Sequence, residues 1–378
     1  MAVVKFGDIV RDIKINVDRT NNSYEHYVAG DHMDSEDLTI HRCGNFATDD
    51  VGPAFTRIFK PGQILYGSRR TYLKKVAVAD FEGICANTTF VLESKDESLF
   101  DNRILPFIML SDAFTRWSIA HSKGSTNPYV LFSDLADYEF DLPPIAEQKV
   151  LADKLWAAYR LKESYKKLIA ATEEMVKSQF IEMFFKNTWK EKYLEDVVSE
   201  DCSLSYGIVQ PGEGVEDGIP VVRPVDLVSD IVEPDCLKKT TVDIANSYKR
   251  TTLKGGELLL CVRGTTGLLS MASNRLNGGN VTRGIVPIWF KKDISKAFMF
   301  HQMKSDYVQT QIKENTYGTT LLQINIKDLR KIKVILPPED LQLKFVSVAE
   351  QADKSGFELR KSIVSIDKVI KSLINEKI

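Results

Sequence analysis

The sequence predicts two tandem globular domains of mixed α/β (α+β) type, each followed by a long helix. Three observations support this fold class: an internal repeat, a Leu-Pro-Pro breaker that occurs twice, and a long Pro-free segment after each breaker. We expect domain limits of 1–144 and 188–338, with helices over 145–187 and 339–378. Because an amphipathic helix of this length needs a partner, the two helices are expected to pair with each other.

The internal repeat has an offset of 194 residues. Leu142-Pro143-Pro144 recurs as Leu336-Pro337-Pro338, and 16 of the 87 positions from Gly62 to Gln148 are identical in the second copy without a gap. Residues 5–10 resemble 193–198 at an offset of 188, so the second copy has about six extra residues in its early loops. A period this long indicates a duplicated domain and not a solenoid.

Each copy begins with short runs of β-branched, aliphatic and aromatic residues, such as 62–66 and 256–262, separated by Gly, Asn and Asp. This pattern is typical of a mixed globular domain. The segment after each Leu-Pro-Pro is Pro-free and Gly-poor, and a proline is tolerated where a helix begins.

Apolar residues recur three and four positions apart in both long segments, in the same register after the Leu-Pro-Pro. This spacing predicts a coiled-coil seam, weakened at Lys162, Gln179 and Gly356. Ordinary core packing is the alternative interpretation. The predicted helix-pairing residues are Leu155, Ala158, Tyr165, Ile169, Val176, Ala352, Leu359, Ile363, Ile366, Ile370 and Leu373.

Further apolar residues widen this face of the first helix. They are Leu161, Leu168 and Met175 beside the seam, and Phe180, Ile181, Phe184 and Phe185 at the end of the helix. Such a face could dock a helix of another protein, or it could cap the neighbouring domain; the sequence leaves both alternatives open.

The formal net charge of −2 excludes a uniformly basic protein but allows a basic face balanced by an acidic one. The sequence shows no signal peptide and no apolar run long enough to cross a membrane. Its five scattered cysteines are typical of free thiols in a reducing compartment. We therefore expect a cytoplasmic protein without membrane contact.

Motifs for catalysis are missing: there is no phosphate-binding loop, GxSxG, HExxH or GxGxxG. We expect no catalytic residues, no cofactor and no metal. His26, His32, His41 and Cys43 have spacings that match no standard metal site, so they are interpreted as polar loop residues.

Several short motifs carry a family resemblance. Gly256-Glu257-Leu258-Leu259-Leu260 precedes Arg263-Gly264-Thr265-Thr266-Gly267, and Gly124-Ser125-Thr126 and Gly318-Thr319-Thr320 each stand ten residues before an Asp-Leu pair. With the opening Pro143-Pro144-Ile145-Ala146-Glu147-Gln148, nearly the whole chain resembles the specificity subunit of type I restriction-modification systems. Two segments depart from the pattern: 68–71 lacks the glycines of the 262–267 loop, and 339–342 keeps only the Gln.

The resemblance implies that each globular unit is a target-recognition domain and that the helices pair antiparallel, with a pseudo-twofold relation between the copies. It further implies that double-stranded DNA carrying two different half-sites is the ligand. Methyltransferase subunits, expected to be two, would dock on the helices, and restriction subunits could join them. The chain itself would hold neither S-adenosylmethionine nor ATP.

Recognition of DNA requires Arg, Lys and amide donors at base edges and cationic or hydroxyl donors at phosphates. Tyr24, His26 and His32 lie in a loop that differs between the copies, as readers of different sequences should. The predicted DNA-binding residues are Arg69, Arg70, Lys74, Lys75, Lys123, Ser125, Thr126, Arg223, Arg263, Thr265, Thr266, Arg283, Thr319 and Thr320. The main rival hypothesis is a non-catalytic cytosolic coiled-coil scaffold, which would show no salt-dependent binding to duplex DNA.

Overall fold

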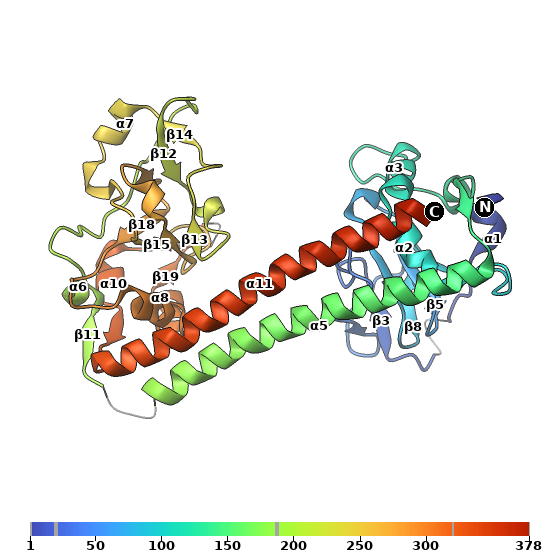
Figure 1. Ribbon diagram of the computed structural model, residues 1–378, viewed down its shortest axis with the longest axis horizontal. Helices are drawn as coiled ribbons and strands as arrows, with labels where there is room; N and C mark the ends of the chain where they lie inside the picture. Colours follow the sequence, from blue (N-terminus) through green and yellow to red (C-terminus); the bar gives the residue numbers. More distant parts are fainter. Residues whose placement is uncertain (1, 19–21, 186–188, 320, 378) are drawn as a thin grey trace. The chain divides into compact units, whose positions relative to one another are not determined.

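The computed structural model describes residues 2–18, 22–185, 189–319 and 321–377 (Figure 1). The chain forms two compact units. Unit 1 consists of residues 1–168 and 358–378, and unit 2 consists of residues 169–357. Each unit contains one globular domain with parts of both long helices. None of the described helices has an apolar stretch of the length and hydropathy that crossing a membrane requires.

The globular domain of unit 1 has two four-stranded sheets. The first is antiparallel, in the order β2 (Val10–Asp12), β9 (Thr89–Ser94), β6 (Ile64–Gly67) and β7 (Val76–Val78). The second has the order β4 (Gly44–Asn45), β3 (His26–Val28), β8 (Gly83–Ala86) and β5 (Phe55–Phe59), with β3 and β8 parallel. The main core lies on the side of the first sheet that faces the helices α1 (Phe6–Ile9), α2 (Leu105–Leu110), α3 (Asp112–Ala120) and α4 (Phe132–Ala136).

Unit 2 repeats this plan with a different second sheet. Its first sheet has the order β13 (Ile231–Val232), β16 (Leu269–Ala272), β15 (Leu258–Cys261) and β18 (Ile285–Ile288). Its second sheet has three strands, β14 (Lys239–Thr240), β12 (Ile219–Val222) and β17 (Asn280–Val281), with β12 and β17 parallel. The helices of this domain are α6 (Leu194–Val197), α7 (Val242–Asn246), α8 (Lys296–Lys304), α9 (Asp306–Glu314) and α10 (Ile326–Arg330).

One strand pair joins the beginning and the end of each domain. In unit 1, β1 (Ala2–Lys5) pairs antiparallel with β10 (Glu139–Leu142), and Lys5 lies opposite Glu139. In unit 2, β11 (Glu191–Tyr193) pairs with β21 (Lys333–Ile335), and Tyr193 lies opposite Lys333. The first strands are thus 188 residues apart and the second strands 194, as the alignment of the two copies predicts.

A long helix follows each Leu-Pro-Pro: α5 (Ile145–Phe184) and α11 (Glu339–Lys377). A buried glutamine anchors the first turn of each. Nε2 of Gln148 donates to the carbonyl of Pro143 at 2.8 Å, and Nε2 of Gln342 donates to that of Pro337 at 2.8 Å. Gln148 also accepts from the Asp101 amide and donates to the Leu99 carbonyl. Both helices therefore start at a fixed point on their domain, because the glutamine side chain bonds to a proline carbonyl that would otherwise lack a hydrogen-bond partner.

The two helices pack together in both units. In unit 1, Leu151 and Leu155 of α5 share the domain core with Ile374 of α11. In unit 2, Phe180 and Phe184 at the end of α5 pack on Phe345 near the start of α11, with ring centroids 5.1 and 5.7 Å apart. The start of one helix meets the end of the other in each unit, so the expected antiparallel pairing of the helices is confirmed.

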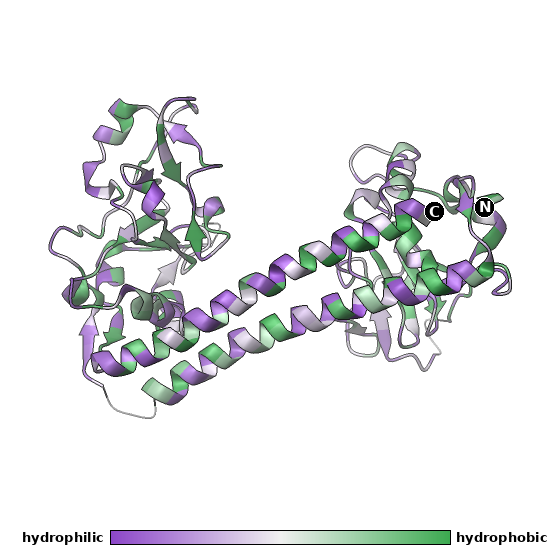
Figure 2. Cartoon of the chain, viewed as in Figure 1, coloured by the Kyte–Doolittle hydropathy of each residue, from purple (hydrophilic) through white to green (hydrophobic). Residues whose placement is uncertain are grey.

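Hydrophobic and hydrophilic residues alternate along both long helices (Figure 2), and the burial of their side chains follows the predicted spacing. Leu155 and Ala352 are buried, and the remaining predicted pairing residues are half-buried. Leu161, Met175, Val364 and Val369, by contrast, are 45–54% exposed. Of the aromatic residues at the end of α5, Phe180 and Phe184 cap the core of unit 2, whereas Ile181 and Phe185 remain exposed.

Candidate nucleic-acid interface

The candidate interface of unit 1 consists of two loops held side by side by backbone hydrogen bonds. The amide of Arg70 donates to the carbonyl of Pro128 at 2.7 Å, and the amide of Val130 donates to that of Ser68 at 3.0 Å. Arg69 therefore lies opposite Tyr129, and Lys123 pairs with Tyr129 on the other side. This loop pair presents the Arg69–Arg70 segment next to the turn at residues 123–126.

The candidate interface of unit 2 has the same backbone arrangement 194 residues later. The Gly264 amide donates to the Leu322 carbonyl at 2.8 Å, and the Ile324 amide donates to the Val262 carbonyl at 3.0 Å. Arg263 lies opposite Gln323, which pairs with Tyr317 in the hairpin of β19 (Thr316–Tyr317) and β20 (Gln323–Ile324). Since each of these contacts matches one in unit 1, both domains build their loop pair on one scaffold.

Left-handed backbone conformations shape both loop pairs. Gly264 has a φ of 92°, and the matching Arg70 has a φ of 49°. A residue with a Cβ adopts this region at a cost of about 1 kcal/mol. The first copy therefore forms the same turn with an arginine in place of the glycine, at the cost of some backbone strain. Gly318 has a φ of 110°, and a Cβ there would lie 2.3 Å from the Leu321 carbonyl oxygen, so this turn requires glycine.

Three predicted arginines have no side-chain partner among the described residues, although Arg263 is half-buried. Within the described parts of the chain, the guanidinium groups of Arg69, Arg263 and Arg283 form no hydrogen bond or ion pair, and Arg69 and Arg283 are exposed. Arg283 lies beside the second loop pair, because the carbonyl of its neighbour Gly284 accepts from the Val262 amide at 2.8 Å. The adjacent Arg70 is exposed, and its Nε donates to Asn127 Oδ1 at 3.2 Å.

The other predicted basic residues are engaged within the chain. Lys74 pairs with Glu36 at 2.9 Å and Asp112 at 3.1 Å, and Lys123 pairs with Asp134 at 2.9 Å. Lys75 donates to the carbonyl of Gly30. Burial lowers the pKa of Lys74, but its two carboxylate partners outweigh this effect and raise the pKa above its usual value. The carboxylates offset the charges of Lys74 and Lys123, so these two lysines would attract a phosphate less than an arginine without an acidic partner.

Arg223 has an acidic partner three residues later. Its side chain pairs with the Asp226 carboxylate at 2.8 Å, and this hydrogen bond raises the pKa of the guanidinium. The backbone of Arg223 nevertheless lies next to the second loop pair, because the preceding Val222 accepts from the Thr282 amide. The structure thus brings Arg223, Arg263 and Arg283 into one region of unit 2.

The predicted hydroxyl groups lie in the turns of the loop pairs. Ser125, Thr126, Thr265 and Thr319 are exposed. Thr266 is half-buried, and its hydroxyl oxygen lies 3.3 Å from that of Thr316. Thr320 lies outside the described residues. The turns therefore offer exposed hydroxyls beside the arginines, an arrangement suited to phosphate oxygens.

The histidines and cysteine of the first early loop do not share one site. His26 Nδ1 lies 3.7 Å from the Cys43 sulfur, whereas His32 accepts from the Ala29 amide and His41 pairs with Asp37. Tyr24 is half-buried in the same loop. The interpretation as separate polar loop residues fits these contacts.

Tyr129 and Gln323 were not among the predicted binding residues. They occupy matching positions between the two loops of each pair, next to Arg69 and Arg263. The gap-free offset of 194 was the signal that could have identified them, because it places both residues five positions after the Gly of each turn.

Two duplicated mixed domains, each with a loop pair that carries an arginine at the same position, and two long helices that pack together in each unit define a tandem two-domain architecture. The chain belongs to the family of the type I restriction modification DNA specificity domain, whose model matches residues 10–174 and 187–365. The two matches correspond to the two copies of the repeat.

Similar proteins include the EcoBI specificity subunit of a type I restriction enzyme from Escherichia coli, 24% identical over 288 residues. That alignment covers 68% of this chain and 60% of the relative, so it leaves two fifths of the relative unmatched. The MjaVIII specificity subunit from Methanocaldococcus jannaschii is 22% identical over 78% of this chain and 73% of the relative.

A solved structure shares the fold over almost the full chain. The crystal structure of a type I restriction-modification system S subunit from M. genitalium has a TM-score of 0.58 and 15% identity, and the match covers 98% of this chain and 94% of that one. The expected fold of two tandem domains with paired helices is confirmed.

Proposed function

We propose that this chain is the DNA-specificity subunit of a type I restriction-modification complex and has no catalytic activity of its own. The domains at 1–144 and 188–338 would each bind one half-site of duplex DNA. The observation that carries the proposal is the loop pair built on the same backbone hydrogen bonds in both domains, with an arginine at the same position in each.

The side chains on the shared scaffold predict an asymmetric target. Arg69 and Arg263 match, but Tyr129 stands where the second domain has Gln323, and Lys123 stands where it has Tyr317. A glutamine amide can bind an adenine edge through two hydrogen bonds, which a tyrosine cannot do. Two domains with one scaffold and different contact residues would therefore read different half-sites in one geometry.

The helices offer the surface for methyltransferase subunits. Leu161 and Met175 of α5 and Val364 and Val369 of α11 are 45–54% exposed, although apolar side chains in a coiled coil usually face the partner helix. Two methyltransferase subunits would dock on these faces, and restriction subunits would join that assembly in the cytoplasm.

The test is methylation mapping of DNA from cells that express this chain with the methyltransferase subunit of the same system. We expect a bipartite, asymmetric adenine-methylation motif that disappears when this chain is omitted. A methyltransferase that binds this chain yet methylates no motif would contradict the proposal and favour the scaffold hypothesis. Binding of the chain to duplex DNA should also weaken steeply with salt, since each phosphate contact releases a counterion.

A further inference from the structure

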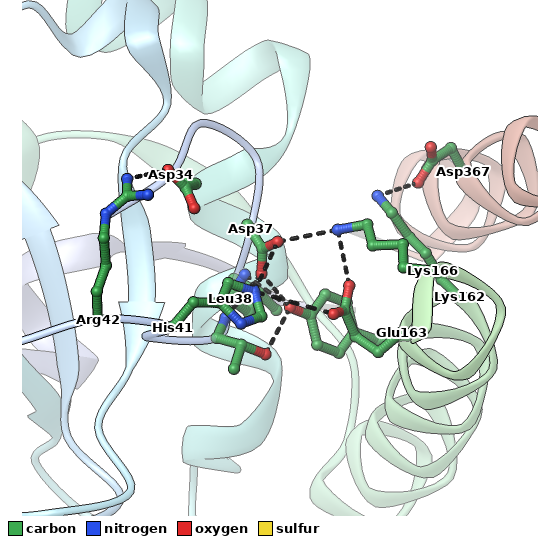
Figure 3. Close-up of polar contacts among 11 residues, drawn as sticks. Asp34, Asp37, Leu38, His41, Arg42, Lys162, Glu163, Lys166 and Asp367 are labelled. Carbon is green, nitrogen blue, oxygen red and sulfur yellow. Dashed lines mark hydrogen bonds and ion pairs between the residues drawn. The ribbon is translucent and has the colours of Figure 1, made fainter. Parts of the chain in front are cut away.

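A polar network fastens a loop of the first recognition domain to the long helices (Figure 3). Its centre is the carboxylate of Asp37, which is only 7% exposed. The Tyr159 hydroxyl of α5 donates to Asp37 at 2.7 Å, and Lys166 of α5 donates to it at 2.9 Å. The Thr39 amide and the His41 ring complete the shell of Asp37 at 3.0 and 3.2 Å.

The hydroxyl of Tyr159 also holds the backbone of the same loop. It accepts from the buried amide of Leu38 at 2.9 Å and lies 3.0 Å from the Thr39 hydroxyl. Burial by itself would raise the pKa of Asp37, but the hydrogen bonds from Tyr159, Lys166 and Thr39 hold it far below its usual value. The carboxylate is therefore charged and fully engaged across the junction between domain and helix.

The network continues from α5 to α11. One turn from Tyr159 and Lys166, the ammonium of Lys162 pairs with Asp367 of α11 at 2.6 Å (Figure 3). Loop, first helix and second helix are thus connected by short polar contacts within unit 1.

A metal ion is a poor occupant for this cluster. Oxygen and nitrogen atoms of Asp37, His41 and Glu163 lie within 4.8 Å of one another, which is close enough to share a cation. The Lys166 ammonium, however, contacts both carboxylates, at 2.9 Å from Asp37 and 2.8 Å from Glu163. The lysine supplies the positive charge that a metal would otherwise bring.

Apolar packing leaves room at this junction. A cavity of about 140 Å³ lies between the domain and the helices, lined among others by Leu38, Phe107, Tyr159, Lys162, Ile370 and Ile374. Charged side chains of Glu36, Asp112 and Lys371 also line it, so the contact between domain and helices is partly polar here. The directional hydrogen bonds of the network therefore act beside the apolar packing of Leu151 and Leu155 in orienting the domain on the helices.

The second copy lacks the tyrosine and the glutamate of this network, although Arg360 stands in place of Lys166. At the offset of 194, Asp353 stands in place of Tyr159 and Phe357 in place of Glu163. The network is a feature of the first domain and not of the duplicated plan.

We propose that Asp37, Tyr159 and Lys166 are positioning residues that set the angle of the first recognition domain on the α5/α11 pair, and thereby the half-site spacing at which the subunit acts. This inference rests on the proposed function. It predicts that loss of the network relaxes the preference for spacer length, whereas the base preferences within each half-site remain.

The experiment uses the assembled complex with its methyltransferase subunits and targets whose half-sites are separated by the natural spacer or by one base pair more or less. For Tyr159→Phe and Asp37→Asn, we expect the methylation-rate ratio between the natural and altered spacers to fall about tenfold. Lys166→Gln is a milder change, because this side chain is 38% exposed, and it should lower the same rate ratio by less. It keeps the inference testable if the first two variants fold poorly.

Asp12→Asn is the matched control. The Asp12 carboxylate is buried and pairs with Arg57 at 2.7 Å between strands of the same domain, without contacting either long helix. It should reduce stability but keep the spacer preference. Network variants that keep the wild-type spacer preference, or a control that loses as much of it, would overturn the inference.

A second measurement separates this inference from the proposed function. In the full chain without DNA, amide hydrogen exchange of the segment 36–42 should speed up at least about tenfold in Tyr159→Phe relative to Asp12→Asn. Unchanged exchange there would refute the network even if the wild-type complex reads a bipartite target. A wild-type complex without any bipartite target, combined with faster exchange, would refute the proposed function and its spacer consequence but keep the network as a structural junction.

Discussion

The ammonium of Lys162 on α5 lies 2.6 Å from the carboxylate of Asp367 on α11, at a position where the predicted seam would otherwise hold an apolar side chain. The lysine side chain is 12% exposed and the aspartate 40%. A lone charge at a coiled-coil seam is costly, so this pair fixes the register of the helices in unit 1.

Asp367→Asn should destabilise unit 1 by about 1–2 kcal/mol, because it leaves the largely buried ammonium of Lys162 without its counter-charge. Urea unfolding of the full chain measures the effect. Asp137→Asn removes the partner of Lys5 in an ion pair whose side chains are 49% and 68% exposed, and it should cost clearly less than Asp367→Asn because solvent screens the pair. Equal losses in the two variants would argue against a role of the seam pair in fixing register.

Gln148→Leu should be more harmful than Gln342→Leu, although the two residues occupy matching positions. Gln148 satisfies the Asp101 amide and the carbonyls of Leu99 and Pro143, whereas the Gln342 side chain, within the described chain, bonds only to Pro337. We expect losses of about 2–4 and about 1 kcal/mol in the free energy of unfolding, respectively. Thermal unfolding of both variants checks the order, and a reversed order would contradict this account of the helix starts.

The stability of unit 2 should depend on pH through His301 of α8. Burial, followed by the nearby Lys304, lowers the pKa of His301 to about 4, and Asp230 opposes this only in part. The ring packs edge-on against Phe345 with centroids 5.4 Å apart. Between pH 6.5 and 4 the unfolded chain binds a proton that the folded chain does not, so the free energy of unfolding falls as the pH drops.

The expected loss over this window is up to about 3 kcal/mol. The difference between wild type and His301→Gln, followed by denaturant unfolding from pH 7 to 4, isolates this histidine from the carboxylates that titrate in the same range. Parallel pH profiles for the two proteins would show that folding does not lower the pKa of His301.

Arg263→Ala should weaken the binding of target DNA by about 1–3 kcal/mol, because a guanidinium without a partner in the described chain can donate to a base edge or a phosphate. If Arg263 reads a base, the methylation motif should also lose its base preference at one position of one half-site. Arg275→Ala is the control, since Arg275 is 61% exposed but pairs with Asp235 at 2.7 Å away from the loop pair. Unchanged affinity and motif in Arg263→Ala would remove this residue from the interface.

The helices and the duplication were predictable because both leave a regular pattern in the sequence itself. Apolar spacing and Leu-Pro-Pro mark α5 and α11, and their starts at Ile145 and Glu339 are the residues directly after the second proline.

The candidate interface was less predictable, because side-chain charge is decided by partners distant in the sequence. Lys74 looked as available as Arg69, yet it pairs with Glu36 and Asp112, each 38 residues away. The contact of Asp37 with Tyr159 spans 122 residues. No local sequence pattern predicts such pairings, since they depend on which loops the sheets bring together.

The division of the helices between the units also has a consequence for biosynthesis. Unit 2 is continuous, from residue 169 to 357, so all its residues are synthesised before the C-terminal end of α11. Unit 1 starts first but needs Ile374 for its core and Asp367 for its ion pair. The domain translated first is thus completed last, and it must keep its unfinished apolar face from aggregating until the final residues emerge.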